Sequence, residues 1–464
     1  MAFAVLPAPA DELLIQNARL IDGSGGPPRA NVDILIGDGR IRAIEPSGSL
    51  APRDYSIEAD GMTALPGLID AHVHFVAAPG TSYRHDSDAT IRHLNHQHLR
   101  AYLACGITTV LDAGAFTKVA RDTQRWLAAG HPGPRYLTTG PYVRPPGGYG
   151  SPRFGAEASP AEVEAKLDVI QSLHGVGVKL GLQEGIGPFG GPAQFTPDVL
   201  AAVVQGAHRR GLPLFVHART ESTQSAALDL GAHAIMHAAS DEIFPQDVSD
   251  EFIKRLAHSG AFQLSTLSLT DTLPGLYDTR QLEEPRVRLV VPEIELETAR
   301  APDAVRHFYT NLIGWQAPWT FVFTRPWIAR FILSRDRLLR ALRVGQDNLL
   351  REHRAGVPIV AATDAPSPWP DALYHFHGPQ LAREFELLGE AGFSPLEAIT
   401  AGTSTPAKML GLDAEIGTLA VGKRADVVLV AGDPSQDLRT LRNVTWTIRD
   451  GVAHTPQEWM GQPR

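Results

Sequence analysis

The sequence predicts an α/β fold, namely a (β/α)8 barrel (TIM barrel) that carries a small β-sandwich domain built from both ends of the chain. Through the middle of the chain, short apolar runs of strand length alternate with longer stretches of helical periodicity. This alternation is typical of a parallel sheet whose strands are joined by crossover helices. At both ends, strand-like runs follow one another without helices between them. The 464 residues suffice for one large domain with an accessory domain.

The two chain ends predict the β-sandwich. Residues 12–64 contain strand candidates separated by Asp-Gly turns such as Asp38-Gly39, which is a hairpin signal. Residues 416–453 show a similar series of strand candidates. We expect residues 1–64 and 415–464 to be two parts of one sandwich, and residues 65–414 to form the barrel.

Eight buried strands are expected in the barrel, each a short apolar run of the kind that a parallel sheet buries on both faces. The candidates lie at residues 63–68, 107–111, 135–139, 176–180, 213–217, 233–237, 261–266 and 357–363. Helical stretches fall between them, the clearest at residues 90–104, 160–174, 196–210, 221–230 and 335–355.

The connection between the seventh and eighth strands is much longer than a crossover helix requires. Its excess, residues 270–334, is rich in aromatic side chains. Two interpretations stay open for this insertion: a lid or hydrophobic wall over a substrate, and a small satellite core or subunit interface. The aromatic residues are Phe308, Tyr309, Trp315, Trp319, Phe321, Phe323, Trp327 and Phe331.

Composition excludes several classes of function. The formal net charge is -9, and no basic face that would neutralise phosphates is visible, so nucleic acid is not an expected partner. With a single cysteine, Cys105, no intramolecular disulfide can form. Residues 312–333 are apolar, but their prolines and arginines are costly in lipid, so we expect no membrane span. Residues 1–10 lack the basic start of a signal peptide, which predicts a cytoplasmic protein. We also expect a homo-oligomer.

His72 and His74 lie one residue apart at the end of a short apolar run. In a strand, residues i and i+2 point to the same face, so the two imidazoles would project together. Neutral imidazoles are common zinc ligands, and such a pair suits a shared metal. Alone, the pair is equally compatible with two polar residues at the mouth of a strand.

Four further polar residues end other predicted strands, namely Lys179, His217, His237 and Asp364. In a (β/α)8 barrel the carboxyl ends of all strands face one mouth, where active sites lie. Each residue alone has a structural alternative, such as an Asp that caps a helix. Their consistent register at successive strand ends predicts a common site.

Over nearly the whole chain, the sequence resembles the amidohydrolase superfamily of metal-dependent hydrolases. Motifs that carry the resemblance are Pro66-Gly67-Leu68-Ile69-Asp70-Ala71-His72-Val73-His74, Gly106-Ile107-Thr108-Thr109-Val110, Thr363-Asp364-Ala365 and Gly422-Lys423-Arg424-Ala425-Asp426. The resemblance implies two divalent metal ions, with zinc expected first and cobalt or manganese as alternatives. It implies that His72, His74 and Asp364 hold the more buried metal and that His217 and His237 hold the second.

The resemblance also implies that Lys179 is N6-carboxylated by carbon dioxide and bridges the two metals. A free ammonium beside two cations would be repelled, whereas a carbamate is an anionic ligand. An unmodified, ion-paired Lys179 remains the alternative. Asp364 would be the catalytic residue, because a carboxylate close to the metal-bridging hydroxide can take its proton and pass it to the leaving nitrogen.

Within the superfamily, the sequence is most similar to the prolidase-like and imidazolonepropionase-like branch, whose members cleave peptides or N-acyl amino acids. The branch often has Gly-Gly-His-Gly where this chain has Tyr149 in Gly147-Gly148-Tyr149-Gly150, and a tyrosine where it has Arg219. Both departures lie where the substrate's polar end is expected. We therefore expect Tyr149, Arg219 and Arg144 to bind substrate, with Arg153 as a further candidate, although each arginine could instead be a surface charge.

The predicted function is hydrolysis of an amide or peptide bond in an N-acyl amino acid or peptide-like substrate with a bulky hydrophobic group. The alternatives are trimming of a modified peptide in bottromycin-type biosynthesis, lactonase or arylesterase activity on a C–O bond, and a non-catalytic assembly role. A deaminase of cyclic amidines fits less well, because such enzymes usually use one metal and lack the lysine. The remaining cluster, His93, His96 and His98, is expected on an exposed helix face.

Overall fold

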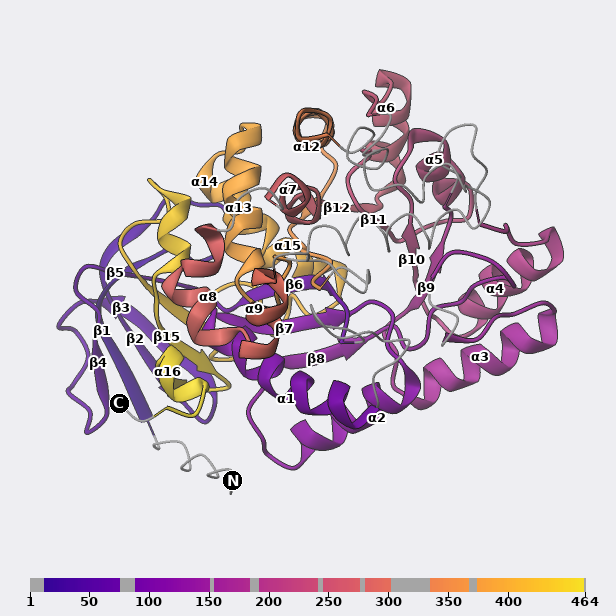
Figure 1. Ribbon diagram of the computed structural model, residues 1–464. Coiled ribbons are helices and arrows are strands. Elements are labelled where there is room, and N and C mark those ends of the chain that lie inside the picture. Colours follow the sequence, from indigo (N-terminus) through magenta and orange to yellow (C-terminus); the bar gives the residue numbers. More distant parts are fainter. Residues whose placement is uncertain are drawn as a thin grey trace.

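The computed structural model describes residues 12–75, 88–150, 154–183, 192–240, 245–275, 280–301, 334–366 and 374–462. Figure 1 shows two parts. The indigo N-terminal and yellow C-terminal segments build a sheet at one side, and strands flanked by helices make up the rest of the molecule.

Eight parallel strands form the barrel. They pair as a three-stranded sheet, in the order β6-β7-β8, and a five-stranded sheet, in the order β13-β12-β11-β10-β9. Two isolated parallel bridges, Val73 with Ala365 and Val143 with Leu180, join the edges of these sheets and close the barrel. The predicted barrel is therefore present. Its strands are β6 (Leu68–Val73), β7 (Ile107–Asp112), β8 (Arg135–Thr138), β9 (Val178–Gly181), β10 (Leu214–His217), β11 (Ala234–Met236), β12 (Phe262–Leu264) and β13 (Ile359–Val360).

The first barrel strand lies later in the sequence than predicted. Residues 63–68 were expected to form it, but β5 (Met62–Pro66) pairs with β14 (Val427–Ala431) in the terminal sheet. The strand that enters the barrel is β6, after Gly67. A Cβ on Gly67 would lie 2.1 Å from Thr108 Oγ1, so only glycine lets the chain pass this close to β7.

Helices follow most of the barrel strands. Side chains at the start of several helices satisfy backbone N–H groups, as Ser249 does for Phe252 N at 3.1 Å, and Gly260 ends its helix in the left-handed region at φ 73°. The helices are α1 (Asp88–Ala104), α2 (Thr117–Ala128), α3 (Pro160–Ser172), α4 (Pro197–Arg209), α5 (Glu221–Asp229), α6 (Asp250–Ser259), α7 (Leu267–Gly275), α12 (Arg335–Arg354), α13 (Gln380–Ala391), α14 (Pro395–Ala401) and α15 (Ser404–Met409).

The terminal β domain combines both chain ends, as predicted, but its strands form one hydrogen-bonded sheet and not two separate ones. The order is β16-β15-β14-β5-β1-β2-β3, with β4 beside β1. An isolated antiparallel bridge joins Arg40, at the start of β3, to Arg424, just before β14. The edge strand β3 therefore lies back against the middle of the sheet. The remaining strands are β1 (Glu12–Leu20), β2 (Arg29–Gly37), β3 (Arg40–Pro46), β4 (Ser56–Glu58), β15 (Val444–Arg449) and β16 (Val452–His454). A short helix, α16 (Pro456–Trp459), ends the described chain.

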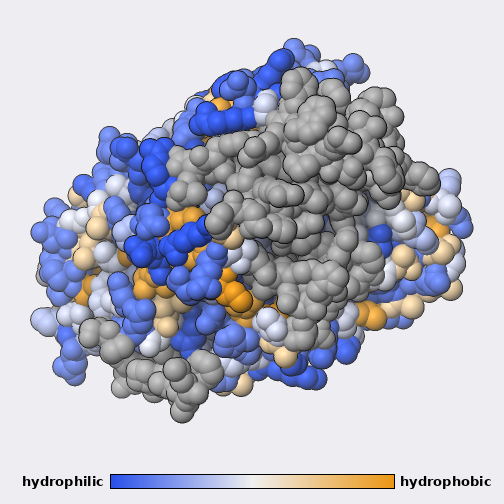
Figure 2. Space-filling view, in the orientation of Figure 1, coloured by the Kyte–Doolittle hydropathy of each residue, from blue (hydrophilic) through white to orange (hydrophobic). Residues whose placement is uncertain are grey.

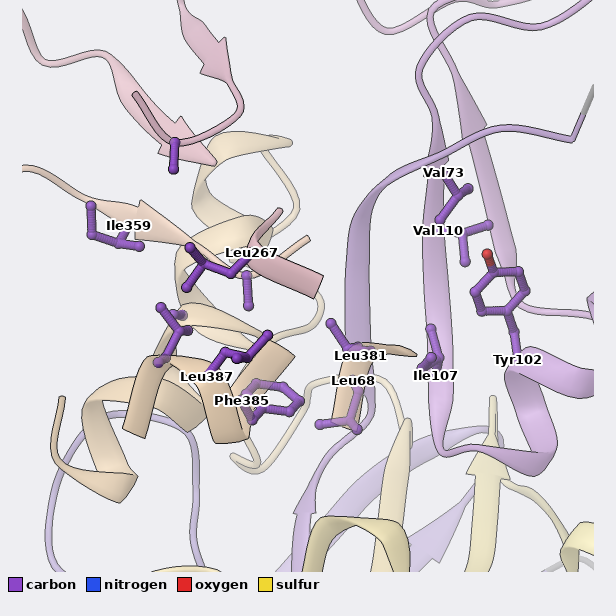
Figure 3. Packing of buried hydrophobic residues seen from close by; sticks show 14 of the residues in the cluster. Leu68, Val73, Tyr102, Ile107, Val110, Leu267, Ile359, Leu381, Phe385 and Leu387 are labelled. Carbon is purple, nitrogen blue, oxygen red and sulfur yellow. The ribbon is translucent and has the colours of Figure 1, made fainter. Parts of the chain in front are cut away.

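Separate apolar clusters hold these parts together. Inside the barrel, Phe215, Met236 and Leu264 are fully buried among small residues from neighbouring strands. Between the barrel and its helices, the side chains of β6 and β7 meet Tyr102 of α1, as Figure 3 shows for Val73 and Val110. This dense packing makes the strand ends a rigid platform for the site.

Part of the insertion is described, and it packs on the flank of the barrel. It contains η3 (Arg280–Glu283), α8 (Pro285–Val290) and α9 (Glu293–Arg300). Arg286 donates hydrogen bonds to the carbonyls of Ala104 and Val444, both at 2.8 Å, which places α8 beside the end of α1 and the start of β15. Further on, Tyr374 donates to the Ala299 carbonyl at 3.3 Å. The aromatic residues from Phe308 to Phe331 lie outside the described residues.

The prediction for His98 was wrong. His93 is exposed and His96 is partly buried, but His98 is only 1% exposed and its Nε2 lies 2.6 Å from Glu295 Oε1 of α9, itself fully buried. His98 follows Leu94 by four residues and precedes Tyr102 by four, so it belongs to the buried face of α1. The pair therefore fastens the insertion to the barrel.

We expect Glu295→Ala to lower the free energy of unfolding by about 3–5 kcal/mol, because it leaves His98 buried without its partner. Thermal and urea denaturation followed by circular dichroism would measure this effect. The control is Glu293→Ala, which removes an ion pair with Arg300 from a side chain that is 67% exposed and should cost no more than about 1 kcal/mol. Equal losses in the two variants would contradict the anchoring role.

Hydrophilic residues cover much of the described surface in the view of Figure 2, with apolar residues between them. Among the described residues, Ile294 of α9 and Val421 are the exposed large hydrophobic side chains, at 50% and 64%. In the same residues, no helix combines the length and apolar character that crossing a membrane would demand.

Candidate active site

Five of the six predicted metal ligands lie at or just beyond the carboxyl ends of barrel strands, and Lys179 is the second residue of its strand. β6 carries His72 and leads into His74, β9 carries Lys179, and β10 ends at His217. His237 directly follows β11, and Asp364 follows β13 after three residues. All six side chains are buried, with between 0% and 8% exposure.

His72, His74 and Asp364 converge on one point. The Nε2 atoms of the two histidines lie 3.2 Å apart, and Asp364 Oδ1 lies 3.0 Å from His72 Nε2 and 2.9 Å from His74 Nε2. The backbone sets this geometry, because Asp364 N donates to the His72 carbonyl at 2.7 Å and His74 N to the Ala365 carbonyl at 2.8 Å. Asp364 adopts φ 62°, in the left-handed region that residues other than glycine rarely adopt.

This group of three residues fits a divalent metal ion. Its three ligand atoms all lie within 4.8 Å of one another. Burial holds the pKa of His72 well below its usual value, so its imidazole is neutral and its lone pair can bind a metal. Two imidazole nitrogens that face each other beside one carboxylate oxygen are brought together favourably by a shared cation.

Lys179, His217 and His237 lie directly beside this group. The ring centroids are 5.0 Å apart for His72 and His237 and 4.5 Å apart for His217 and His237, and Lys179 Nζ lies 3.4 Å from His72 Nε2. Burial lowers the pKa of both His217 and His237 well below the usual value. It also lowers the pKa of Lys179 to about 7, an effect that nearby Asp364 opposes. A neutral amine of this kind can react with carbon dioxide.

Two supporting residues were missed by the sequence analysis. Gln183 Oε1 lies 2.7 Å from His217 Nε2, and Thr266 Oγ1 lies 3.0 Å from His237 Nδ1. These contacts leave His217 Nδ1 and His237 Nε2 as the ring nitrogens that can bind a metal. Gln183 and Thr266 each lie just after a barrel strand, so the register rule used for the ligands could have indicated them.

Asp70 also supports the site, and it is fully buried. Its carboxylate accepts hydrogen bonds from Thr363 N at 3.1 Å and Thr363 Oγ1 at 2.7 Å, and burial raises its pKa to about 7. Thr363 precedes Asp364, and Asp70 precedes His72 by two residues on the same strand. Asp70 therefore ties the strand of the histidine pair to the strand of the aspartate.

The predicted substrate-binding residues lie on the side of His217. The Tyr149 ring stacks on the His217 ring, with centroids 4.2 Å apart and an angle of 24°. Arg219 is half-buried, and its Nη2 donates to the Ser240 carbonyl at 3.2 Å. Tyr149 therefore lies against a predicted ligand of the second metal, and Arg219 is near enough to His217 and His237 for its charge to lower the pKa of both. Contact of either residue with substrate stays a prediction.

Arg144 plays a more structural part than its prediction as a substrate ligand implies. It is 6% exposed, and its guanidinium donates to the carbonyls of Gly148, Tyr149 and Gly155. It thus holds the loop that carries Tyr149, and any direct contact with substrate stays a prediction. Arg153 lies outside the described residues.

Tyr142 was not predicted, yet its hydroxyl lies at the barrel mouth. A Cβ on Gly181 would be 1.9 Å from this hydroxyl, so the ring fills the place of a side chain two residues beyond Lys179 on the same strand face. Gly181 pairs with His217 across β9 and β10. Tyr142 is 4% exposed, and its hydroxyl has no hydrogen-bond partner among the described residues.

Comparisons with known proteins agree with this architecture. A segment of 75 residues is 44% identical to a dihydroorotase of Citrifermentans bemidjiense, and 77 residues are 40% identical to an N-acyl-D-glutamate deacylase of Alcaligenes xylosoxydans xylosoxydans. The two matches cover 16% of this chain each, and 17% and 15% of the respective relatives. The chain thus matches about a sixth of the length of these curated relatives.

Likeness in structure extends over the whole chain. The crystal structure of a Xaa-Pro dipeptidase with methionine bound in its active site matches with a TM-score of 0.70, at 23% identity, over 96% of this chain and 100% of that one. At this identity the match shows the fold. The model of the amidohydrolase family matches residues 63–453, from the start of β5 to β16. The chain belongs to the amidohydrolase family.

Proposed function

We propose that this protein is a binuclear metal-dependent amidohydrolase. In our proposal it cleaves the amide bond of an N-acyl amino acid or peptide-like substrate that carries a bulky hydrophobic group. The observation that carries the proposal is the convergence of His72, His74 and Asp364 within 4.8 Å of one another at the mouth of the barrel. Three further buried residues, Lys179, His217 and His237, bring the number of candidate ligands to six, which is enough for two metals.

The residues present fit two metal positions. His72, His74 and Asp364 would hold one ion, and His217 Nδ1 and His237 Nε2 would hold the other. Carboxylated Lys179 would supply an oxygen to each, because its amine is buried beside His72 and its pKa is about 7. When bound, zinc or a similar ion lowers the pKa of water and polarises a carbonyl group.

The chain's own residues would then orient and move protons. Asp364 Oδ1 lies 3.0 Å from His72 Nε2 and 2.9 Å from His74 Nε2, so a water held beside these three atoms would be within reach of its carboxylate. We assign Asp364 the role of general base toward this water and then of general acid toward the leaving nitrogen.

Arg219 and Tyr149 support an amino-acid-like substrate. A guanidinium beside the site pairs with a carboxylate in a bidentate manner, and the exposed edge of a tyrosine packs against apolar groups. The deacylase that the chain resembles acts, by its name, on an N-acyl amino acid, and the structural neighbour is named a dipeptidase. We therefore expect a free carboxylate on the amine side of the scissile bond.

A hydrolysis screen tests the proposal. Zinc-loaded protein would be offered N-acyl amino acids, dipeptides and the matching lactones and aryl esters, with detection of free amine or acid. We expect amide substrates with aromatic acyl groups to be turned over fastest. Faster turnover of lactones or aryl esters would assign the site to C–O bonds instead, and absence of turnover with both metals bound would contradict the proposed activity.

Arg219→Met is expected to raise KM for carboxylate-bearing substrates about 10- to 100-fold, because a charge-assisted hydrogen bond is lost, and to leave turnover of the matching carboxamides nearly unchanged. The measurement is kcat and KM for each acid and its amide. Arg210→Met is the control, since that arginine pairs with Glu164 and Asp168 on the outer helices. An equal rise in KM for the acid and for its amide would show that Arg219 does not bind the carboxylate.

A further inference from the structure

A series of buried hydrogen bonds connects the outer helix α13 to the site. It begins at His237, whose backbone is restrained on one side by two glutamines. Gln224 Nε2 donates to the His237 carbonyl at 3.1 Å, and Gln263 Nε2 donates to the same oxygen. The His237 backbone adopts φ 86°, and with its carbonyl held in this way, the direction of the ring nitrogens depends on side-chain rotation and on the tautomer.

Thr266 restrains that freedom. Its Oγ1 lies 3.0 Å from His237 Nδ1, and both residues are 3% exposed, so no bulk water competes for the contact. When the ring donates its Nδ1–H to this hydroxyl, Nε2 carries the lone pair and faces the other histidines. Histidines that bind metals commonly have their second nitrogen held in this way.

Thr266 itself adopts an unfavourable conformation. Its φ is 44°, in the left-handed region that β-branched residues avoid, so the surrounding contacts must hold it there. Glu384 of α13 supplies those contacts. Its carboxylate accepts Ser265 Oγ, Leu267 N at 2.9 Å and Ser268 N at 2.7 Å, on both sides of Thr266.

Glu384 is fully buried and lies at the amino end of α7, where the helix dipole and free N–H groups favour a carboxylate. It is separated from Ser265 by 119 residues, so the contact joins the last part of the barrel to the seventh strand. Burial of a charged group is costly unless the group is paired or hydrogen-bonded, and the hydrogen bonds from Ser265, Leu267 and Ser268 offset this cost.

We propose that Thr266 and Glu384 are positioning residues for the metal site: Thr266 directs His237 Nε2 to the metal, and Glu384 holds Thr266 in the strained turn that allows this. The inference rests on the proposed two-metal function, in which His237 is a ligand. It predicts that these residues act on one metal position and leave the ion at His72, His74 and Asp364 in place.

The test is metal binding by metal-free protein that is reconstituted with cobalt or zinc and bicarbonate. Thr266→Val removes the hydroxyl and keeps the shape, and we expect it to weaken binding of one of two ions about 10- to 100-fold, with a changed cobalt absorption spectrum. Thr266→Ser keeps the hydroxyl and should restore affinity to within about threefold. Glu384→Gln should weaken the same ion, because an amide offers one acceptor oxygen fewer.

Thr272→Val is the matched control, because Thr272 is buried on α7, which begins directly after Thr266, and its hydroxyl donates to the Leu269 carbonyl at 2.8 Å. Circular dichroism and chelator competition would be measured for every variant. If Thr266→Val and Glu384→Gln both bind two ions as tightly as Thr272→Val, the positioning role is overturned. If the wild-type protein binds fewer than two ions, the proposed function fails instead, which is a separate outcome of the same experiment.

Discussion

Asp364→Asn is expected to lower kcat by roughly 10²- to 10⁴-fold while the protein still binds metal. The asparagine oxygen can remain a ligand beside His72 and His74, but an amide cannot accept the proton of the attacking water. The loss should therefore appear in kcat and in the pH profile, with metal content close to that of the wild type. Steady-state kinetics and elemental analysis of the same sample would measure both.

Asp426→Asn is the control for this variant. Asp426 is also a buried aspartate, but it pairs with Arg135 at 2.8 Å, near the opposite end of the barrel. It should reduce stability and leave kcat unchanged. If Asp364→Asn kept full activity, the assignment of Asp364 as the catalytic residue would be wrong.

Lys179→Ala is expected to abolish binding of at least one metal and to lower kcat/KM by on the order of 10³-fold, because several kcal/mol of stabilisation by the metals are lost. Added acetate or propionate should restore part of the activity, since a small carboxylate can occupy the space of the missing carbamate. Lys254→Ala, at an exposed position of α6, is the control.

The same lysine predicts a dependence on pH and carbon dioxide. Because burial lowers the pKa of Lys179 from 10.5 to about 7, the amine is mostly protonated below pH 7 and mostly neutral above it. Only the neutral amine attacks carbon dioxide. Reconstitution of metal-free protein should therefore need bicarbonate, and its rate should rise through pH 7 and level off near pH 8. Full reconstitution without carbon dioxide would favour an unmodified lysine.

The candidate metal ligands at the strand ends could be predicted from the sequence, because the alternation of side chains along a strand depends only on neighbouring residues. The side chains of His72 and His74 point to the same face of their strand in any fold that contains this strand. A barrel places the carboxyl ends of all its strands at one mouth. The first strand was placed wrongly at 63–68 because residues on both sides of Gly67 have the same apolar pattern. Only pairing with β14, more than 350 residues away, assigns β5 to the terminal sheet.

Other features of the site depend on tertiary contacts that no local pattern reveals. Glu384 reaches a turn 119 residues earlier in the chain, and the left-handed conformation of Thr266 contradicts its residue type. The burial of Tyr142 depends on a glycine on the next strand. His98 is different, because its spacing from Leu94 and Tyr102 already indicated the buried face of α1.

The number of divalent ions bound per chain tests the two-metal site most directly. Metal-free wild-type protein and the His72→Ala variant would be reconstituted with zinc, cobalt or manganese in the presence of bicarbonate, and bound metal would be compared with the release of free amine from N-acyl amino acids. We predict two ions in the wild-type protein, activity that rises as they bind, and loss of at least one ion together with activity in His72→Ala. Full activity in metal-free protein, or in His72→Ala, would contradict it.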